Sequence, residues 1–287
     1  MTIRQLITDG KQVLEQNKVE NPSGDSWYLW EYLTGMSRVD YVLDGEKEVE
    51  EEQAKAYKEL IQKRSRHIPL QHLTKVQNFM GYDFFVNEHV LIPRQDTETL
   101  VETVLEYQGA GERILDLCTG SGCIGISLAL LGDYKEVVAV DLSKDALQVA
   151  MRNKEQLLQE KEQKFLLLES DLFTNIEEKM KHSFDFIVSN PPYIPTSVCE
   201  NLMEEVRDYE PRMALDGMED GLYFYRKIID EAREYLKDGG RLFFEIGHDQ
   251  KEDMKAIFAK YKEYSKVEVK KDLAGRDRIA IAMYTKQ

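Results

Sequence analysis

The chain has 287 residues, a length near the point at which one core stops growing and a second domain begins. Hydrophobic residues make up 42% and charged residues 32%, which is typical of folded proteins and excludes collagen-like or low-complexity sequence. The 38 basic and 53 acidic residues give a formal net charge of −15, which disfavours binding to a nucleic-acid backbone.

The sequence lacks the patterns of membrane and secreted proteins. No run approaches the roughly 18 apolar residues of a membrane span, and the first residues lack the apolar run and cleavage site of a signal peptide. The three cysteines, Cys118, Cys123 and Cys199, fit neither an even disulfide set nor a metal-ligand spacing. We therefore expect a cytoplasmic protein with structural thiols, no metal and no membrane contact.

Residues 1–75 have the pattern of helices. Apolar residues recur at helical spacing near the N-terminus, residues 25–33 begin with a capping-type residue, and residues 46–66 form a long charged segment with few apolar positions. The nearby Trp27, Tyr28 and Trp30 could stack on a ligand, but aromatic residues at this spacing are more often core. We expect residues 1–75 to form a small helical bundle that recognises a substrate protein.

The pattern changes after residue 75. Alternation within residues 79–93 predicts a hairpin or extended linker, so that residues 76–93 connect two domains. Strands then alternate with helices, which indicates a parallel sheet covered on both faces. Two β-rich runs, 266–271 and 278–284, surround a turn-like segment and predict an antiparallel pair at the sheet edge. The other predicted strands are 113–117, 136–140, 165–168, 184–189 and 241–246, and the predicted helices are 124–131, 144–158 and 222–236.

A parallel sheet that ends in an antiparallel pair resembles the class I methyltransferase fold more than a purely parallel dehydrogenase fold. We therefore expect residues 94–287 to form an α/β, Rossmann-like methyltransferase domain. Its sheet should have seven strands, mostly parallel, with an antiparallel C-terminal hairpin.

A glycine-rich loop follows the first of these strands. Residues 120–125 read Gly-Ser-Gly-Cys-Ile-Gly, which satisfies the dinucleotide pattern GxGxxG. Asp141 ends the next strand, where a carboxylate can accept hydrogen bonds from the ribose of either NAD or S-adenosylmethionine. Asp116 favours S-adenosylmethionine, because a carboxylate directed at the loop repels a pyrophosphate and attracts a cationic sulfonium. The alternative is that Asp116 only binds amides of the loop.

The strand at 184–189 ends in Asn190-Pro191-Pro192-Tyr193. Ligands of open α/β sheets lie beyond the carboxyl ends of the strands, so this segment should face the glycine loop. The side-chain oxygen of Asn190 and the carbonyl of Pro191 can accept the two N–H bonds of a planar NH2 group and expose its lone pair for methyl transfer. Tyr193 offers a flat face for stacking. Asn-Pro also occurs in ordinary turns, which is the alternative interpretation.

Further segments resemble the HemK/PrmC family of release-factor glutamine methyltransferases, and they cover most of the chain from His67 onward. Two positions depart from the family pattern: Cys118 stands where glycine is usual, and Gln95 where a second proline is usual. The resembling segments are Ile92-Pro93-Arg94-Gln95-Asp96-Thr97-Glu98, residues 116–122, Asn190-Pro191-Pro192-Tyr193-Ile194, Glu210-Pro211 with Ala214-Leu215 and Gly221-Leu222, Glu245-Ile246-Gly247 with Gln250, and residues 272–278.

The resemblance implies methyl transfer from S-adenosylmethionine to the side-chain nitrogen N5 of a glutamine, in the GGQ motif of peptide chain release factors. It also implies which residues form the site, and we add Asp116 from its position before the loop. The expected cofactor-binding residues are Asp116, Cys118, Thr119, Gly120, Ser121, Gly122, Asp141, Leu172 and Asn190; the expected substrate-binding residues are Asn190, Pro191, Pro192 and Tyr193, of which Asn190, Pro191 and Tyr193 are expected to be catalytic.

Three alternatives stay open. Methylation of a glutamine in a ribosomal protein needs the same chemistry, and adenine-N6 methylation of nucleic acid uses a similar motif but needs a basic groove. An NAD-dependent oxidoreductase or a nucleotide-binding module leaves Asn190 to Tyr193 unexplained.

Arg94 and Glu98 either form a structural ion pair or contact the substrate. We expect a monomer.

Overall fold

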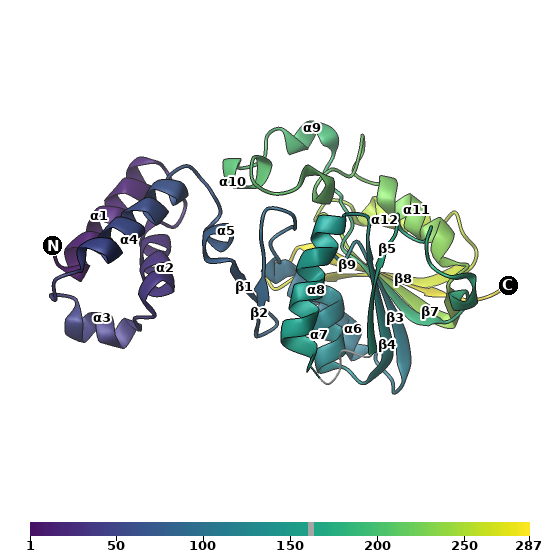
Figure 1. The fold of residues 1–287 in the computed structure, drawn as a ribbon. Coiled ribbons are helices and arrows are strands. Elements are labelled where there is room, and N and C mark those ends of the chain that lie inside the picture. Colours follow the sequence, from purple (N-terminus) through teal and green to yellow (C-terminus); the bar gives the residue numbers. More distant parts are fainter. Residues whose placement is uncertain (160–163) are drawn as a thin grey trace. The chain divides into compact units, whose positions relative to one another are not determined.

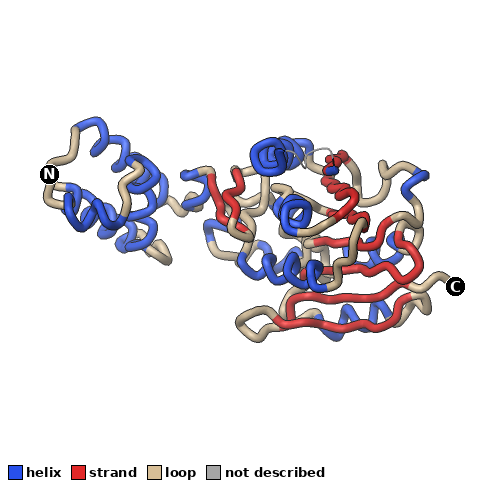
Figure 2. Tube along the Cα trace, turned by 90° about the horizontal axis from the view of Figure 1, so that it is seen from below, coloured by secondary structure: helices blue, strands red, loops and turns tan. Residues whose placement is uncertain are grey.

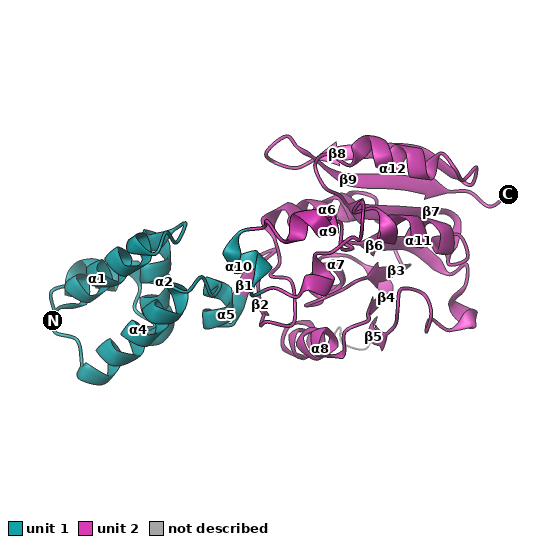
Figure 3. Cartoon of the chain, turned by 90° about the horizontal axis from the view of Figure 1, so that it is seen from above, with its two compact units in different colours: residues 1–76, 203–209 teal, residues 77–202, 210–287 magenta. Residues whose placement is uncertain are grey.

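The computed structural model describes residues 1–159 and 164–287. These residues form two compact units, coloured separately in Figure 3. The first contains residues 1–76 and 203–209, and the second contains residues 77–202 and 210–287. The inclusion of 203–209 in the first unit is a feature that the sequence did not predict.

The first unit is helical. Helix α1 begins at a capping box in which Thr2 and Gln5 exchange hydrogen bonds, and α2 ends at Gly35 in the left-handed conformation. Trp27 and Trp30 are buried in the core of this unit, whereas Tyr28 is half exposed. The core interpretation is therefore confirmed for the two tryptophans. The helices are α1 (Ile3–Gln16), α2 (Pro22–Thr34), α3 (Arg38–Asp44), α4 (Glu51–Arg64), α5 (Leu70–Thr74) and α10 (Glu204–Arg207).

A buried arginine explains how residues 203–209 belong to this unit. Arg64, at the end of α4, binds Asp25 of α2 at 2.6 Å and Glu205 of α10 at 2.8 Å. The Tyr209 hydroxyl also donates to the carbonyl of Arg66. Buried charge of this kind requires partners, and here one partner comes from a segment some 140 residues away in the sequence, counted from Arg64 to Glu205.

A two-stranded hairpin follows, formed by β1 (Val76–Phe79) and β2 (Tyr82–Phe85). Its two-residue turn, Met80-Gly81, has positive φ at both positions, as tight hairpin turns of this length require. The hairpin lies within the predicted linker 76–93, although it begins three residues before the alternation noted from residue 79. Residues 86–94 have no regular secondary structure.

The second unit contains a seven-stranded sheet with the order β5-β4-β3-β6-β7-β9-β8 (Figure 1). Five strands are parallel; β9 is antiparallel to β7, and β8 is antiparallel to β9, at one edge of the sheet (Figure 2). The predicted class I fold is confirmed. The strands are β3 (Glu112–Leu117), β4 (Tyr134–Asp141), β5 (Phe165–Glu169), β6 (Phe184–Ser189), β7 (Leu236–Glu245), β8 (Tyr264–Lys271) and β9 (Asp277–Tyr284).

Helices cover both faces of this sheet. Alternate residues of the strands point to opposite sides, so Ile114 packs with α6 and α7 while Leu115 packs with α11 and α12. Helix α8 flanks α7 on the first face. The helices are α6 (Gln95–Glu106), α7 (Cys123–Leu131), α8 (Lys144–Leu158), α9 (Thr196–Cys199), α11 (Tyr223–Ala232) and α12 (Lys251–Phe258), with short 3-10 turns η2 (Glu178–Met180) and η3 (Arg212–Ala214).

Several boundaries differ from the prediction. Helix α6 begins at Gln95, and Gln95 to Glu98 form its first turn. Helix α11 ends at Ala232, not at residue 236, because Leu236 already pairs with Phe184 at the start of β7. Helices α3 and α12 were not predicted. Helix α3 has no buried residue, so it lacks a core-facing apolar period. Helix α12 buries Met254, Ile257 and Phe258 at helical spacing, a short pattern that the sequence analysis did not use.

Neither a membrane helix nor a metal cluster is found in the described part of the chain. None of its helices combines the length and the apolar character that a bilayer crossing requires. Nor do residues 1–159 and 164–287 contain a group of three or more His, Cys, Asp or Glu side chains arranged to hold a metal ion.

Candidate active site

The glycine loop connects β3 to α7 through residues with left-handed backbone. Cys118, Gly120 and Gly122 have φ values of 59°, 55° and 81°. This explains why glycine is usual at the first position, since a left-handed backbone strains any residue with a Cβ. Gly122 has no room for a side chain: a Cβ there would lie 2.8 Å from the Ile126 side chain and 3.3 Å from Ala150 on α8.

Asp141, at the end of β4, is hydrogen-bonded to this loop. Its Oδ2 accepts from the backbone amide of Gly120 at 2.8 Å, and its Oδ1 accepts from the amide of Ser143 at 2.9 Å. Burial raises the pKa of Asp141, and the amide hydrogen bonds oppose that shift. A carboxylate oxygen can accept more than one hydrogen bond, so each oxygen retains capacity for a ligand.

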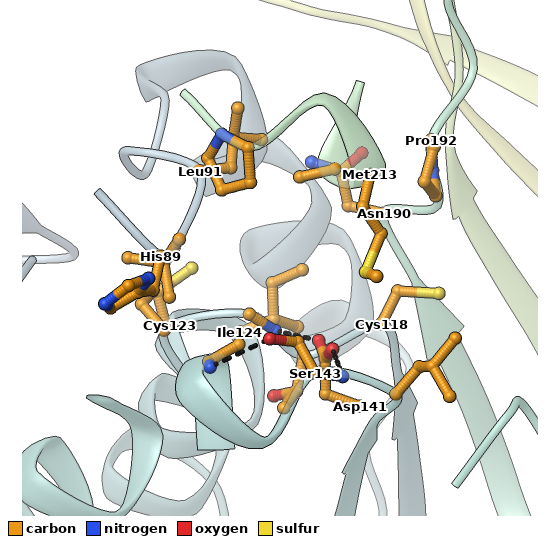
Figure 4. Close-up of a pocket in the computed structure, with 18 of the residues that line it drawn as sticks. His89, Leu91, Cys118, Cys123, Ile124, Asp141, Ser143, Asn190, Pro192 and Met213 are labelled. Carbon is orange, nitrogen blue, oxygen red and sulfur yellow. Dashed lines mark hydrogen bonds between the residues drawn. The ribbon is translucent and has the colours of Figure 1, made fainter. Parts of the chain in front are cut away.

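A cavity opens at the carboxyl ends of β3, β4, β5 and β6 (Figure 4). This is the position at which ligands bind in open α/β sheets. Most of the predicted cofactor residues line it, and so do two residues of the predicted substrate segment. The predicted residues at the cavity are Cys118, Thr119, Gly120, Ser121, Asp141, Leu172, Asn190 and Pro192.

Four predicted site residues do not line the cavity: Asp116, Gly122, Pro191 and Tyr193. Gly122 and Pro191 are chain neighbours of residues that do. Gly122 and Pro191 therefore belong to the backbone turns that carry the neighbouring cavity residues.

Asp116 is directed at the glycine loop, as the sequence predicts, and does not line the cavity. The side chain is fully buried, and its Oδ2 accepts from the Thr119 hydroxyl at 2.6 Å and from the Gly125 amide at 3.0 Å. Burial raises its pKa to about 7, although both hydrogen bonds lower it. The alternative interpretation therefore fits the geometry better: Asp116 fixes the glycine loop from behind.

Asn190 and Tyr193 are held by residues outside their own segment. The Asn190 side-chain nitrogen donates to the Thr97 hydroxyl at 3.4 Å, and the Tyr193 hydroxyl donates to Glu245 Oε1 at 3.2 Å. Tyr193 packs against the core between the sheet and α11. Burial first, then the Glu245 charge, raises the pKa of the Tyr193 phenol, which stays protonated.

Arg94 and Glu98 do not bind each other. Arg94 Nη2 donates to both oxygens of Glu210, at 2.6 and 2.8 Å, and Glu98 accepts from the Met80 amide at 2.6 Å. The pair of Arg94 and Glu210 connects the segment before α6 to residues 211–214, which form part of the cavity wall.

The sequence analysis did not assign a further set of cavity residues to the site. Some of them stand in segments that it noted for another reason: Cys123 and Ile124 belong to the GxGxxG pattern, and Pro93, Thr97, Pro211 and Ala214 to the resembling segments. The others, several of which directly follow strand ends, carry no local pattern. The missed residues are His89, Val90, Leu91, Pro93, Thr97, Cys123, Ile124, Leu142, Ser143, Ala146, Ser170, Asp171, Pro211, Met213, Ala214 and Phe224.

Comparison with known proteins gives matches over nearly the whole chain. Residues 5–74 match the family model described as the PrmC N-terminal domain, and residues 94–206 match the methyltransferase small domain. The release factor glutamine methyltransferase of Clostridium acetobutylicum is 38% identical over 285 residues, 99% of each chain. That of Leptospira interrogans is 40% identical over 284 residues, 98% of this chain and 97% of its own.

Solved structures support the fold alone. The hMettl16 catalytic domain, in complex with the MAT2A 3'UTR hairpin 6, has a TM-score of 0.56 at 16% identity, over 75% of this chain and 80% of its own. A methyltransferase from Pyrococcus furiosus has a TM-score of 0.52 at 19% identity, over 73% of this chain and 91% of its own.

Proposed function

The chain belongs to the release factor glutamine methyltransferase family, and from this premise we propose that it transfers a methyl group from S-adenosylmethionine to the side-chain amide nitrogen N5 of a glutamine in peptide chain release factors. The observation that carries the proposal is the position of Asn190, which lines the same cavity as the glycine loop and Asp141. A methyl acceptor and a methyl donor must meet in one cavity.

The cavity fits the donor. Asp141 would hold the ribose hydroxyls, and the apolar side chains of Leu142 and Leu172 would flank the adenine. The buried hydroxyl of Ser121 has no hydrogen-bond partner among the described residues and offers a further polar contact. S-adenosylmethionine supplies an electrophilic methyl group on a cationic sulfonium, and Asp141 contributes negative charge to the cavity that receives it.

The residues that follow β6 would orient the acceptor. An amide nitrogen is a poor nucleophile because its lone pair is delocalised. Asn190 Oδ1 and the Pro191 carbonyl each accept one N–H of the glutamine side chain, which turns the lone pair toward the methyl group. Orientation of this kind can lower a barrier by roughly 7 to 11 kcal/mol in favourable cases. No strong base is needed before transfer, since the nitrogen can lose its proton afterwards.

The N-terminal helices would recognise the release factor. Support comes from α3, where Val39, Val42 and Leu43 are 68, 72 and 75% exposed at spacings that put them on one side of the helix. Tyr28 and Tyr32 of α2 are also half exposed. Exposed apolar side chains at this density are typical of protein contact surfaces.

The finer points of the proposal are the GGQ motif as the site of methylation, action as a monomer in the cytoplasm, and a protein rather than nucleic acid as the acceptor. The formal charge of −15 supports the last point. Glutamine methylation of a ribosomal protein is the second candidate.

The test uses the purified full chain, radiolabelled S-adenosylmethionine and purified release factor. We expect label in the intact release factor and none when its GGQ glutamine is replaced by alanine. Label that persists in the replaced protein contradicts the assigned acceptor. Ribosomal proteins and RNA, tested in parallel, should stay unlabelled.

A further inference from the structure

One segment of the family resemblance has no role in the proposed chemistry: Glu245-Ile246-Gly247 with Gln250. Glu245 is the last residue of β7, and β7 is the parallel neighbour of β6. Ser189, at the end of β6, pairs with Phe244. Asn190 and Glu245 therefore leave the sheet at the same register on adjacent strands.

Glu245 is buried behind the segment Asn190 to Tyr193. Its side chain is 2% exposed, and Oε1 accepts the hydrogen bond from the Tyr193 hydroxyl. Oε2 has no hydrogen bond of good geometry among the described residues. Burial raises the pKa of Glu245, whereas the hydroxyl of Thr97 and the guanidinium of Arg278 lower it, in that order. The Thr97 hydroxyl oxygen accepts from Asn190 Nδ2 at 3.4 Å, so its own hydrogen is available to Oε2 of this neighbouring carboxylate.

Gln250 holds the same segment through its backbone. Its Nε2 donates to the Tyr193 carbonyl at 3.0 Å and to the Gly221 carbonyl at 3.3 Å, and its Oε1 accepts from the Gly247 amide at 2.8 Å. Both ends of Tyr193 are therefore fixed from the β7 side, the hydroxyl by Glu245 and the carbonyl by Gln250.

Arg278 does not account for the burial of Glu245. Its guanidinium donates to Asp272 at 3.3 Å and to the Ile246 carbonyl at 3.2 Å, and it lies 3.1 Å from Asp96. A charge that served only to neutralise Arg278 would be redundant beside these two aspartates.

The hydrogen-bond directions among Glu245, Thr97 and Asn190 determine one another. A carboxylate only accepts, so a hydroxyl that interacts with it must donate its single hydrogen. Thr97 then offers only lone pairs to Asn190, and Asn190 must turn its NH2 toward Thr97. The amide oxygen of Asn190 is left to face the cavity, which is the orientation that accepts an N–H of the acceptor.

We propose that Glu245 and Thr97 are positioning residues, which fix the Asn190 amide with its oxygen toward the acceptor nitrogen. This inference rests on the proposed function of Asn190 in orienting a planar NH2 group. If the Asn190 amide were reversed, its NH2 group would face the NH2 group of the acceptor glutamine, with no hydrogen-bond acceptor between them. The lone pair of the acceptor nitrogen would then lose its alignment with the methyl group.

Two nearly isosteric variants test the proposal. Glu245→Gln replaces the acceptor-only group by one that can also donate, and Thr97→Val removes the hydroxyl while keeping the volume. We expect each to lower kcat for release factor at least tenfold. The Kd for S-adenosylmethionine should change less than threefold, and the Tm should not fall for Glu245→Gln, since a buried charge is removed.

Two further variants separate positioning from packing. Thr97→Ser keeps the hydroxyl and loses a methyl group, so it should recover most of the kcat that Thr97→Val loses; packing alone predicts the reverse order. Glu268→Gln is the matched control, because Glu268 on β8 accepts a hydrogen bond from Tyr107 away from the cavity. It should leave kcat unchanged.

An NMR readout keeps the test independent of the acceptor. In protein with labelled asparagine and threonine, the Asn190 NH2 protons should show a nuclear Overhauser effect to Thr97 in the wild type, and Glu245→Gln should abolish it. If the wild type fails to methylate release factor while this contact is present, the proposed function is wrong and the positioning stands. A missing contact in the wild type, or a Glu245→Gln variant with normal kcat, overturns the positioning.

Discussion

Arg94 binds Glu210 with one nitrogen, Nη2, which lies 2.6 and 2.8 Å from the two carboxylate oxygens. The Glu210 side chain is 2% exposed and that of Arg94 is 41% exposed, so a solvent-facing arginine pairs with a buried carboxylate. The pair ties the start of α6 to residues 211–214, three of which line the cavity.

Arg94→Met should therefore weaken donor binding. The substitution keeps the aliphatic bulk and leaves the buried carboxylate without its arginine, which loosens the wall at residues 211–214. We expect the Kd for S-adenosylmethionine to rise about five- to fiftyfold, or about 1 to 2.3 kcal/mol, as measured by calorimetry. Arg226→Met breaks the exposed pair with Asp220 and is the control, with little expected effect. Equal effects of the two variants would contradict the wall assignment.

Asn190→Ala should slow methyl transfer while keeping the donor. The side chain is one of many groups at the cavity, but it is the proposed acceptor of an N–H from the glutamine. We expect kcat to fall about a hundredfold or more, which corresponds to about 2.7 kcal/mol of transition-state stabilisation. Single-turnover assays with saturating donor measure this directly. Normal turnover would remove Asn190 from the mechanism.

Much of the fold follows from local sequence, because each central strand is a short apolar run next to an amphipathic helix. Asp141 and Asn190 were found for the same reason: each stands where such a run ends, and parallel strands bring their carboxyl ends together. Helix α3 was missed because its apolar residues are exposed rather than buried, so it has no core-facing period.

Long-range partners could not be predicted in this way. Arg94 and Glu210 are 116 residues apart, and neither has a neighbour that identifies the other. Asp116 is directed at the loop as predicted, but the sequence does not show whether a carboxylate so directed reaches the ligand cavity or only the loop. Thr97 and Glu245 were recognised only as parts of resembling segments, since their roles depend on hydrogen bonds between separate elements.

Asp141→Ala should weaken donor binding by about 1 to 3 kcal/mol, through the loss of charge-assisted hydrogen bonds to the ribose. The variant also frees the amides of Gly120 and Ser143, so part of the loss reflects a less ordered loop. Asp141→Asn keeps one acceptor oxygen and should lose less than Asp141→Ala. Calorimetry that finds both affinities unchanged would count against the ribose assignment.

Gly221→Ala should reduce kcat by displacing Tyr193. A Cβ at Gly221 would lie 2.3 Å from the Tyr193 carbonyl oxygen, and φ is +71°. Gly239 has a similar φ of +80° but open space around its Cβ position, so Gly239→Ala introduces the backbone strain without the collision. We expect at least a tenfold loss of kcat for Gly221→Ala and lower stability with normal kcat for Gly239→Ala. Equal kcat values would show that Tyr193 tolerates the shift.

Asp116→Asn should change how stability depends on pH. Burial raises the pKa of Asp116 to about 7, whereas an aspartate in the unfolded chain has the ordinary pKa of about 3.9. The folded state thus holds the proton more tightly, so this group's contribution to stability is fully present below about pH 4 and is lost as the pH rises through about 7.

The asparagine does not titrate, and its oxygen can still accept from Thr119 and Gly125. The NH2 group of the asparagine takes the place of Oδ1, which is buried without a hydrogen-bond partner among the described residues. The destabilisation caused by this exchange is the same at every pH. Between pH 5 and pH 8 the free energy of unfolding of the variant should therefore gain about 2.7 kcal/mol relative to the wild type, which loses about 1.4 kcal/mol for each of the roughly two pH units between 5 and the pKa of about 7. Urea unfolding across this range measures the difference. A difference that stays constant with pH would mean that Asp116 is already ionised in the folded protein at pH 5, and that the loop amides outweigh burial.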